Sequence, residues 1–166
     1  MVKYILVLFL FLFYACTNKE SSLSEEEKIG YQAIFNYGKK IQNRGIQVVG
    51  FGGASKEGKT QVLDVTFDSD IELTILIGRK LIIELVDDFL KEINENEKLR
   101  PYLADYPFTA NNVKMCVFGK KVKGNNDLLF SVSSRNANIA YRKDNPNGGL
   151  LITILEETYD EASHKL

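Results

Sequence analysis

The chain has 166 residues, and its 21 Lys and Arg residues nearly balance its 22 Asp and Glu residues. This length suits a single domain. The balanced charge argues against nucleic-acid binding, which needs a clustered excess of Lys and Arg. The hydrophobic fraction of 45% is too high for an intrinsically disordered chain. We therefore expect one ordinary globular domain with no nucleic-acid partner.

The first element is an apolar segment near the N-terminus. Lys3 supplies a positive charge, and residues 4–14 form an unbroken apolar run of 11 residues ahead of Ala15 and Cys16. Eleven helical residues reach about 16 Å, roughly half the thickness of a membrane's hydrocarbon core. The run is therefore typical of a signal peptide rather than of a membrane span. We predict that residues 1–15 are a signal peptide.

The four residues Phe13-Tyr14-Ala15-Cys16 at the end of this segment resemble the lipobox of bacterial lipoproteins. In that motif a large apolar residue, a variable residue and a small residue precede a Cys that becomes lipid-modified. The resemblance implies that Cys16 carries a diacylglyceryl thioether and an N-acyl chain such as palmitate. Such chains would anchor the protein in a membrane of the bacterial cell envelope, on the extracytoplasmic side. An uncleaved anchor and a secreted protein without lipid are the alternatives.

Residues 16–23 are polar and predict a tether between the lipidated Cys and a domain over residues 24–166. Seven residues after Cys16 span at most about 25 Å, so the domain is expected close to the lipid surface. Once Cys16 carries lipid, only Cys116 remains, and no intramolecular disulfide can form. The apolar neighbours of Cys116 indicate a small buried hydrophobic residue. The only His, His164, lies near the C-terminus and is an improbable base for a Cys nucleophile.

The domain begins with a helix signal. Ser24-Glu25-Glu26-Glu27 fits a capping box, in which the Ser24 hydroxyl accepts from the backbone at Glu27 and the Glu27 carboxylate reaches back. Apolar residues then recur at helical spacing, and a basic last turn precedes Gly45. The pattern predicts a helix over 24–44 that packs on a sheet. Its apolar positions are Ile29, Ala33, Tyr37 and Ile41.

Two strands are expected next, over residues 46–51 and 61–67. In the second, Leu63, Val65 and Phe67 alternate with more polar residues, which is the period of a strand with one buried face. Because the two segments follow each other closely, we predict a hairpin.

The residues between these strands match a phosphate-binding motif. Gly53, Gly58, Lys59 and Thr60 occupy the specified positions of the Walker A pattern, so residues 53–60 resemble the loop of P-loop nucleotide-binding proteins. Phosphate binding by that loop requires a helix directly after it, with N-terminal N–H groups aimed at the phosphates. Since the following residues read as a strand, we favour a mobile hairpin turn. A nucleotide-binding or hydrolytic enzyme is the less favoured alternative.

The strongest helical pattern starts at Gly78 and predicts the main core helix. Three carboxylates, Glu84, Asp87 and Asp88, lie opposite its apolar stripe. Such a cluster suggests acid–base chemistry, but Lys80 and Lys91 are spaced to form i,i+4 pairs with Glu84 and Asp87, which favours a solvated face. The apolar stripe comprises Leu81, Ile82, Leu85, Val86, Phe89, Leu90 and Ile93.

A Pro-containing aromatic segment follows. Residues 78–109, with their Arg-Pro-Tyr-Leu and Tyr-Pro-Phe-Thr sequences, resemble an uncharacterised group of small bacterial lipoproteins. That resemblance implies no known activity. Tyr102, Tyr106 and Phe108 either close one end of the core, which we favour, or form a docking patch for a partner.

The rest of the chain predicts strands over 113–118, 128–133, 138–142 and 150–155, followed by a frayed short helix over 156–166. Turn residues between them indicate an antiparallel meander. The expected fold is therefore α+β, a two-layer domain with two main helices packed on a mainly antiparallel sheet.

No zinc spacing or catalytic triad is present, so we expect no metal and no cofactor. The leading functional hypothesis is a non-catalytic, lipid-anchored module that contacts another envelope protein. A small-ligand carrier, using a cleft between the helices and the sheet, is a further alternative.

Overall fold

The computed structural model describes residues 23–122, 125 and 127–166. Cys16, the predicted signal peptide and most of the tether lie outside these residues. The longer elements of the domain are α2 (Glu25–Ile41), β1 (Ile46–Lys56), β2 (Lys59–Ser69), α3 (Ile75–Glu95), β3 (Val113–Phe118), β4 (Ser131–Arg135), β5 (Asn138–Lys143), β6 (Ile152–Thr158) and α4 (Tyr159–Ser163). Three short 3-10 turns are η1 (Gln42–Arg44), η2 (Arg100–Tyr102) and η3 (Ala110–Asn112).

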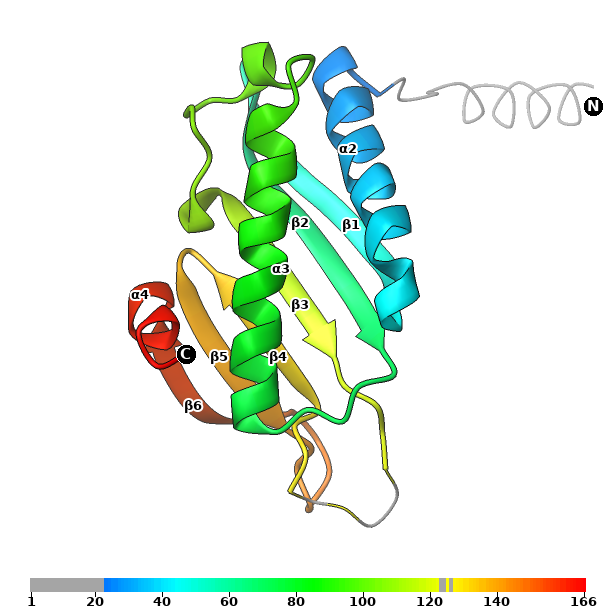
Figure 1. Cartoon of the computed structure of the whole chain (residues 1–166), viewed down its shortest axis with the longest axis vertical. Coiled ribbons are helices and arrows are strands. Elements are labelled where there is room, and N and C mark those ends of the chain that lie inside the picture. Colours follow the sequence, from blue (N-terminus) through cyan, green and yellow to red (C-terminus); the bar gives the residue numbers. More distant parts are fainter. Residues whose placement is uncertain (1–22, 123–124, 126) are drawn as a thin grey trace, which may run out of the picture.

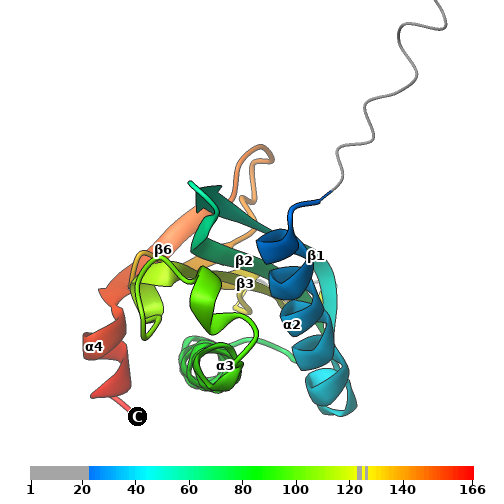
Figure 2. The ribbon, with the colours of Figure 1, turned by 90° about the horizontal axis from the view of Figure 1, so that it is seen from above.

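The six strands form one sheet in the order in which they occur along the chain. Four of the five strand pairs are antiparallel, and only β2 and β3 run parallel. Helix α3 connects these two parallel strands (Figure 1). Seen from above, α2, α3 and α4 all lie on the same face of the sheet (Figure 2). The predicted α+β fold, with two main helices on a mainly antiparallel sheet, is confirmed. We call the covered face the helix side and the other face the open side.

Helix α2 begins as its sequence predicts. The Ser24 hydroxyl accepts a hydrogen bond from the Glu27 backbone, and the Glu27 carboxylate accepts one from the Ser24 backbone at 2.9 Å. The predicted helical segment is divided, because the α-helix ends at Ile41 and η1 continues to Arg44. Gly45 then turns the chain into β1 with a φ of 72°, a left-handed conformation that glycine adopts at little cost.

The core lies between the helices and the helix side of the sheet. Leu85 and Phe89 of α3 are fully buried, as the apolar stripe predicts. Tyr37 of α2 packs against Phe89, with ring centroids 5.1 Å apart, and its hydroxyl donates to the Leu85 carbonyl at 3.0 Å. Burial and the nearby Asp88 carboxylate raise the pKa of Tyr37 above its ordinary range. This tyrosine therefore joins the two helices as a neutral, hydrogen-bonded core residue.

Helix α3 starts one turn earlier than its apolar stripe indicates. Thr74 caps it by accepting from the Ile77 backbone, and the helix then begins at Ile75. Residues 71–74 therefore lead directly into the helix and add no further strand.

The carboxylates of α3 are only partly solvated, because Arg44 at the end of η1 pairs with two of them. Arg44 pairs with Glu84 at 3.0 Å and with Asp88 at 3.3 Å. Lys80 also lies 3.8 Å from Glu84, as expected. Asp87 does not pair with Lys91 as predicted; its carboxylate accepts a hydrogen bond from the Tyr159 hydroxyl at 2.8 Å. Tertiary contacts thus replace the second local pair, and these acids hold elements of the fold together.

The hairpin forms, but its strands are longer than the sequence indicates. β1 reaches Lys56 and β2 starts at Lys59, so Glu57 and Gly58 alone make the turn. Both have positive φ, 53° and 72°, which is the backbone of a tight two-residue hairpin. The expected Gly- and Lys-rich loop is therefore mostly strand. Glycine weakens strand propensity, but regular pairing with β2 overrides that preference.

A buried, charged side chain links the edge strand β6 to the rest of the domain. Glu157 on β6 is 6% exposed and accepts from Arg79 of α3 at 2.7 and 3.2 Å, from Lys165 at 2.7 Å and from the Tyr141 hydroxyl. Burial alone would raise the pKa of Glu157, but the hydrogen bonds from Arg79, Lys165 and Tyr141 outweigh it and lower the pKa to about 2. β6 thus extends through residues predicted as a frayed helix, and α4 is shorter than expected.

Candidate functional site

The residues of the Walker-like motif do not form a phosphate loop. Gly53 lies in β1, Gly58 in the turn, and Lys59 and Thr60 begin β2, so a strand follows where phosphate binding needs a helix N-terminus. The Lys59 ammonium donates to the Pro101 carbonyl, and the Thr60 carbonyl accepts from the Ala104 backbone at 2.9 Å. These residues attach the segment after α3 to the hairpin.

The three candidate aromatic residues do not share one surface. Phe108 is 2% exposed and Tyr102 is half-buried against the core, whereas Tyr106 is 53% exposed. The guanidinium of Arg100 lies 5.0 Å from the centroid of the Tyr106 ring. Asn94 fixes the segment, because its side chain accepts from the Phe108 backbone at 2.8 Å and donates back at 3.0 Å. This arrangement favours closure of the core over a docking patch.

Cys116 lies on the open side of the sheet, and its expected position as a small buried hydrophobic residue is corrected. Along β3, Val113, Met115 and Val117 point into the core, so Cys116 faces away from the helices and is half-buried. Burial raises the pKa of its thiol, and the nearby Arg142 guanidinium opposes this only in part. The thiol is therefore mostly protonated at neutral pH, which makes it a poor nucleophile.

A polar hollow of about 530 Å³ surrounds Cys116 on the open side. Charged groups of both signs line it, including Asp64, Lys114, Arg142 and Glu156. Arg142 donates to the Ser133 hydroxyl at 2.7 Å, so its guanidinium is held by the sheet. Among residues 23–122, 125 and 127–166, no group of three or more His, Cys, Asp or Glu side chains could hold a metal ion.

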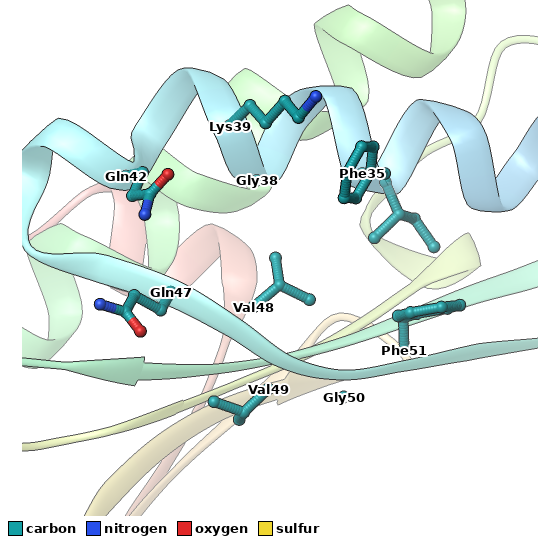
Figure 3. Close-up of a pocket in the computed structure, with 10 residues that line it drawn as sticks. Phe35, Gly38, Lys39, Gln42, Gln47, Val48, Val49, Gly50 and Phe51 are labelled. Carbon is teal, nitrogen blue, oxygen red and sulfur yellow. The ribbon is translucent and has the colours of Figure 1, made fainter.

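A second depression is apolar and lies where α2 borders the edge strand β1 (Figure 3). Its volume is about 420 Å³. We call it the α2/β1 groove. The residues that define it are Phe35, Gly38 and Lys39 from α2, Gln42 from η1, and Gln47, Val48, Val49, Gly50 and Phe51 from β1.

A β-bulge shapes the strand wall of this groove. Val48 pairs with Phe67 of β2 and Gly50 pairs with Thr66, so Val49 is an extra residue without a partner on β2. The bulge reverses the alternation of side chains along β1. As a result Val48 and Phe51, three residues apart, both face α2, whereas Val49 points away from it (Figure 3).

The helix wall approaches β1 closely because of Gly38. A Cβ atom at this position would lie 2.6 Å from Cγ2 of Val48, which is closer than real carbon contacts allow. Glycine is unfavourable inside a helix by about 1 kcal/mol relative to alanine. The close packing of α2 on β1 therefore explains why glycine occupies this position. The same close packing sets the width of the groove.

The groove leaves large apolar side chains exposed to solvent. Phe35 and Phe51 are 55% and 57% exposed. The Tyr31 ring contacts the Phe51 ring edge to face, with ring centroids 5.0 Å apart. The ammonium of Lys39 lies 4.4 Å from the centroid of the Phe35 ring. Exposed aromatic residues that lie close together are typical of contact surfaces.

Sequence reasoning missed this groove, although two signals were present. Phe35 is apolar but falls outside the buried stripe of α2, and glycines 50, 52 and 53 interrupt a strand pattern in a way that is typical of bulges. No protein-family model matches the chain, and no curated protein or solved structure matches it either. In the described part of the chain, no helix has the length and apolar character needed to cross a bilayer.

Proposed function

We propose that the protein is a lipid-anchored, extracytoplasmic module of the bacterial envelope that docks a partner protein in its α2/β1 groove and has no catalytic role. The anchor is inferred from the apolar run that ends at Ala15 and Cys16. A tether of at most about 25 Å would hold the groove close to the membrane surface, where another envelope protein can reach it.

The observation that carries this proposal is the exposed apolar wall of the groove. Two large side chains that are more than half exposed, Phe35 and Phe51, face the groove from its two walls. Covering apolar surface contributes about 25 cal/mol per Å² buried, and interface cores are rich in aromatic residues. Such a wall supports binding of a protein partner.

A small-ligand carrier is the second candidate, because a volume of about 420 Å³ falls in the range of ligand pockets. A pocket of that kind buries most of its ligand, however. Side chains as exposed as Phe35 and Phe51 would leave a small ligand largely in water. The groove therefore suits a macromolecule, which covers the wall from outside, better than a carried molecule.

The anchor is tested by intact mass and detergent partitioning of the full chain and of Cys16→Ser. We expect acyl mass and detergent partitioning in the parent and the loss of both in Cys16→Ser. Cys116→Ser is the matched control and should behave as the parent does. A parent without acyl mass, or a Cys16→Ser variant that partitions identically, contradicts the anchor.

Docking is tested by capture of partners from intact membranes after chemical cross-linking. The double variant Phe35→Ser/Phe51→Ser should lose the captured proteins. Ile152→Ser/Ile154→Ser, which changes exposed residues on the opposite sheet edge, should retain them. Equal capture by the parent and both variants would place any docking site elsewhere.

A further inference from the structure

We infer that β1 accepts an extended, acidic peptide segment of the partner protein as an added strand, whose alternate apolar side chains enter the α2/β1 groove. This inference rests on the docking role proposed above and specifies the chemistry of the partner. It combines three features of one sheet edge: a free strand backbone, an apolar wall and an unpaired cation.

The backbone of β1 is available along one side. The strand is the first in the sheet, so in the described part of the chain only β2 pairs with it. From Gly50 to Ala54 its pairing with β2 is regular and continues beyond the bulge. Three of these five residues are glycines, and a Cβ at Gly52 would meet no atom within 4 Å. This stretch therefore carries few side chains, and its second hydrogen-bonding edge has no strand partner among the described residues.

The groove supplies side-chain recognition beside this backbone. Successive side chains of an extended peptide point to opposite faces of a sheet, so every second one would face α2. There it would meet Phe35 and Phe51 from the two walls. When a peptide adds to a sheet as a strand, its main-chain hydrogen bonds give affinity and its side-chain contacts give specificity.

The charge of the groove selects an acidic segment. None of the ion pairs among the described residues involves Lys39 or Lys56, the cations beside the groove and at the far end of β1. A carboxylate on the peptide can pair with Lys39 at the rim, where Phe35 shields one side of the ammonium. β1 itself contains no acidic residue. The groove thus offers a cation, Lys39, to an acidic chain.

The same facts disfavour a second copy of this chain as the occupant. Pairing β1 with β1 of another copy would bring together two strands without an acidic residue, so neither strand would supply a carboxylate to Lys39 of the other copy. Pairing β1 with β6 in one continuous sheet would place the helix side of β6 on the groove. There Leu155 and Glu157 already pack into their own domain. A segment from a different protein can carry acidic residues and need not have its side chains packed into another domain.

The experiment selects ligands from a displayed library of random twelve-residue peptides against the full chain held in phosphatidylcholine nanodiscs. We expect enrichment of acidic sequences with apolar residues at alternate positions. Lys39→Glu should weaken the best peptide at least tenfold. Lys28→Glu, a reversal at an exposed lysine near the start of α2, should change its affinity less than twofold.

Backbone pairing is tested on the best peptide with two N-methylated versions, one modified at odd positions and one at even positions. An added strand directs alternate N–H groups to β1, so one version should lose binding at least tenfold and the other should retain it. A helical ligand would lose binding in both versions, and a ligand held by side chains alone in neither.

Several results would overturn the inference. These are no enrichment over the Phe35→Ser/Phe51→Ser variant, equal effects of the two N-methylated versions, or self-association of the chain that an Ile154→Ser change abolishes. Circular dichroism melts confirm that each variant is folded. If cross-linked partners still depend on Phe51 while both N-methylated versions bind equally, the docking function stands and strand addition is wrong.

Discussion

The two edges of the sheet differ in how they end. At β6, the buried carboxylate of Glu157 is held by Arg79, Lys165 and Tyr141, and α4 packs back against α3. At β1, the strand is bulged at Val49, is rich in glycine and borders a groove whose apolar side chains are half in water. One edge is fastened by paired charges, and the other presents backbone and apolar surface. We propose that this difference separates a stabilising edge at β6 from a binding edge at β1.

Truncation of the shared core should disturb both edges. Phe89→Ala removes a fully buried ring that packs against Tyr37, and Leu85→Ala removes the side chain one turn earlier. We expect losses of ~2–5 kcal/mol in the free energy of unfolding from lost burial and an unfilled cavity. Glu84→Ala should cost less than ~0.5 kcal/mol, because its ion pairs are on the surface. Urea melts decide, and a loss at Glu84 as large as at Phe89 would show that the helix faces are assigned wrongly.

Loss of the buried carboxylate should loosen the β6 edge. Glu157→Gln leaves the Arg79 guanidinium, which is mostly buried, without its counter-charge. Removing one partner of a buried ion pair costs about 3 kcal/mol or more. Glu156→Gln, an exposed neighbour on the same strand, is the matched control and should change stability by less than ~0.5 kcal/mol. Similar losses in the two variants would mean that the network contributes little.

Acid should weaken the same edge in a defined range of pH. The folded pKa of Glu157, about 2, lies below its ordinary value of 4.5, so its stabilising effect is complete above pH 4.5 and is lost as the pH falls towards 2. The shift corresponds to about 3 kcal/mol. Unfolding free energies of the parent and of Glu157→Gln, measured from pH 6 to pH 2, should therefore converge at low pH. A difference that is constant across this range would contradict the assignment.

Substitutions in the groove should have a small effect on stability and a large effect on binding. Phe51→Ser removes a ring that is 57% exposed and that contacts Tyr31, so we expect a cost of about 1 kcal/mol or less. Capture of the partner should nevertheless fall at least tenfold. Thermal melts and cross-linked yield on the same preparation check both effects. A stability loss comparable to that of Phe89→Ala would make Phe51 a core residue and remove it from the site.

Much of the fold could be predicted from local patterns. The capping box at Ser24, the stripe on α3 and the alternation along β2 and β3 each depend on residues close together in sequence. Such patterns fix which segments become helix or strand and which of their faces are buried. The same patterns predict a strand directly after Lys59 and Thr60, which argues against a phosphate loop.

The remaining features depend on distant partners. Glu157 looks like a residue of a polar tail until Arg79, 78 positions away, is seen beside it. The groove needs a glycine on α2 opposite a bulge on β1, and neither pattern alone predicts the other. The open-side position of Cys116 follows from the alternation of β3, but its neighbour Arg142 comes from β5. Sites of this kind are built where elements meet.

The most direct measurement of the docking claim is photo-cross-linking in intact cells, with p-benzoylphenylalanine placed either at Phe51 on β1 or at Ile154 on β6. These positions lie on the two edges of one sheet, and both side chains are substantially exposed. The account predicts a discrete adduct with another envelope protein from position 51, lost on addition of Lys39→Glu, and no such adduct from position 154. An adduct from 154 alone, or equal adducts from both positions, would contradict it.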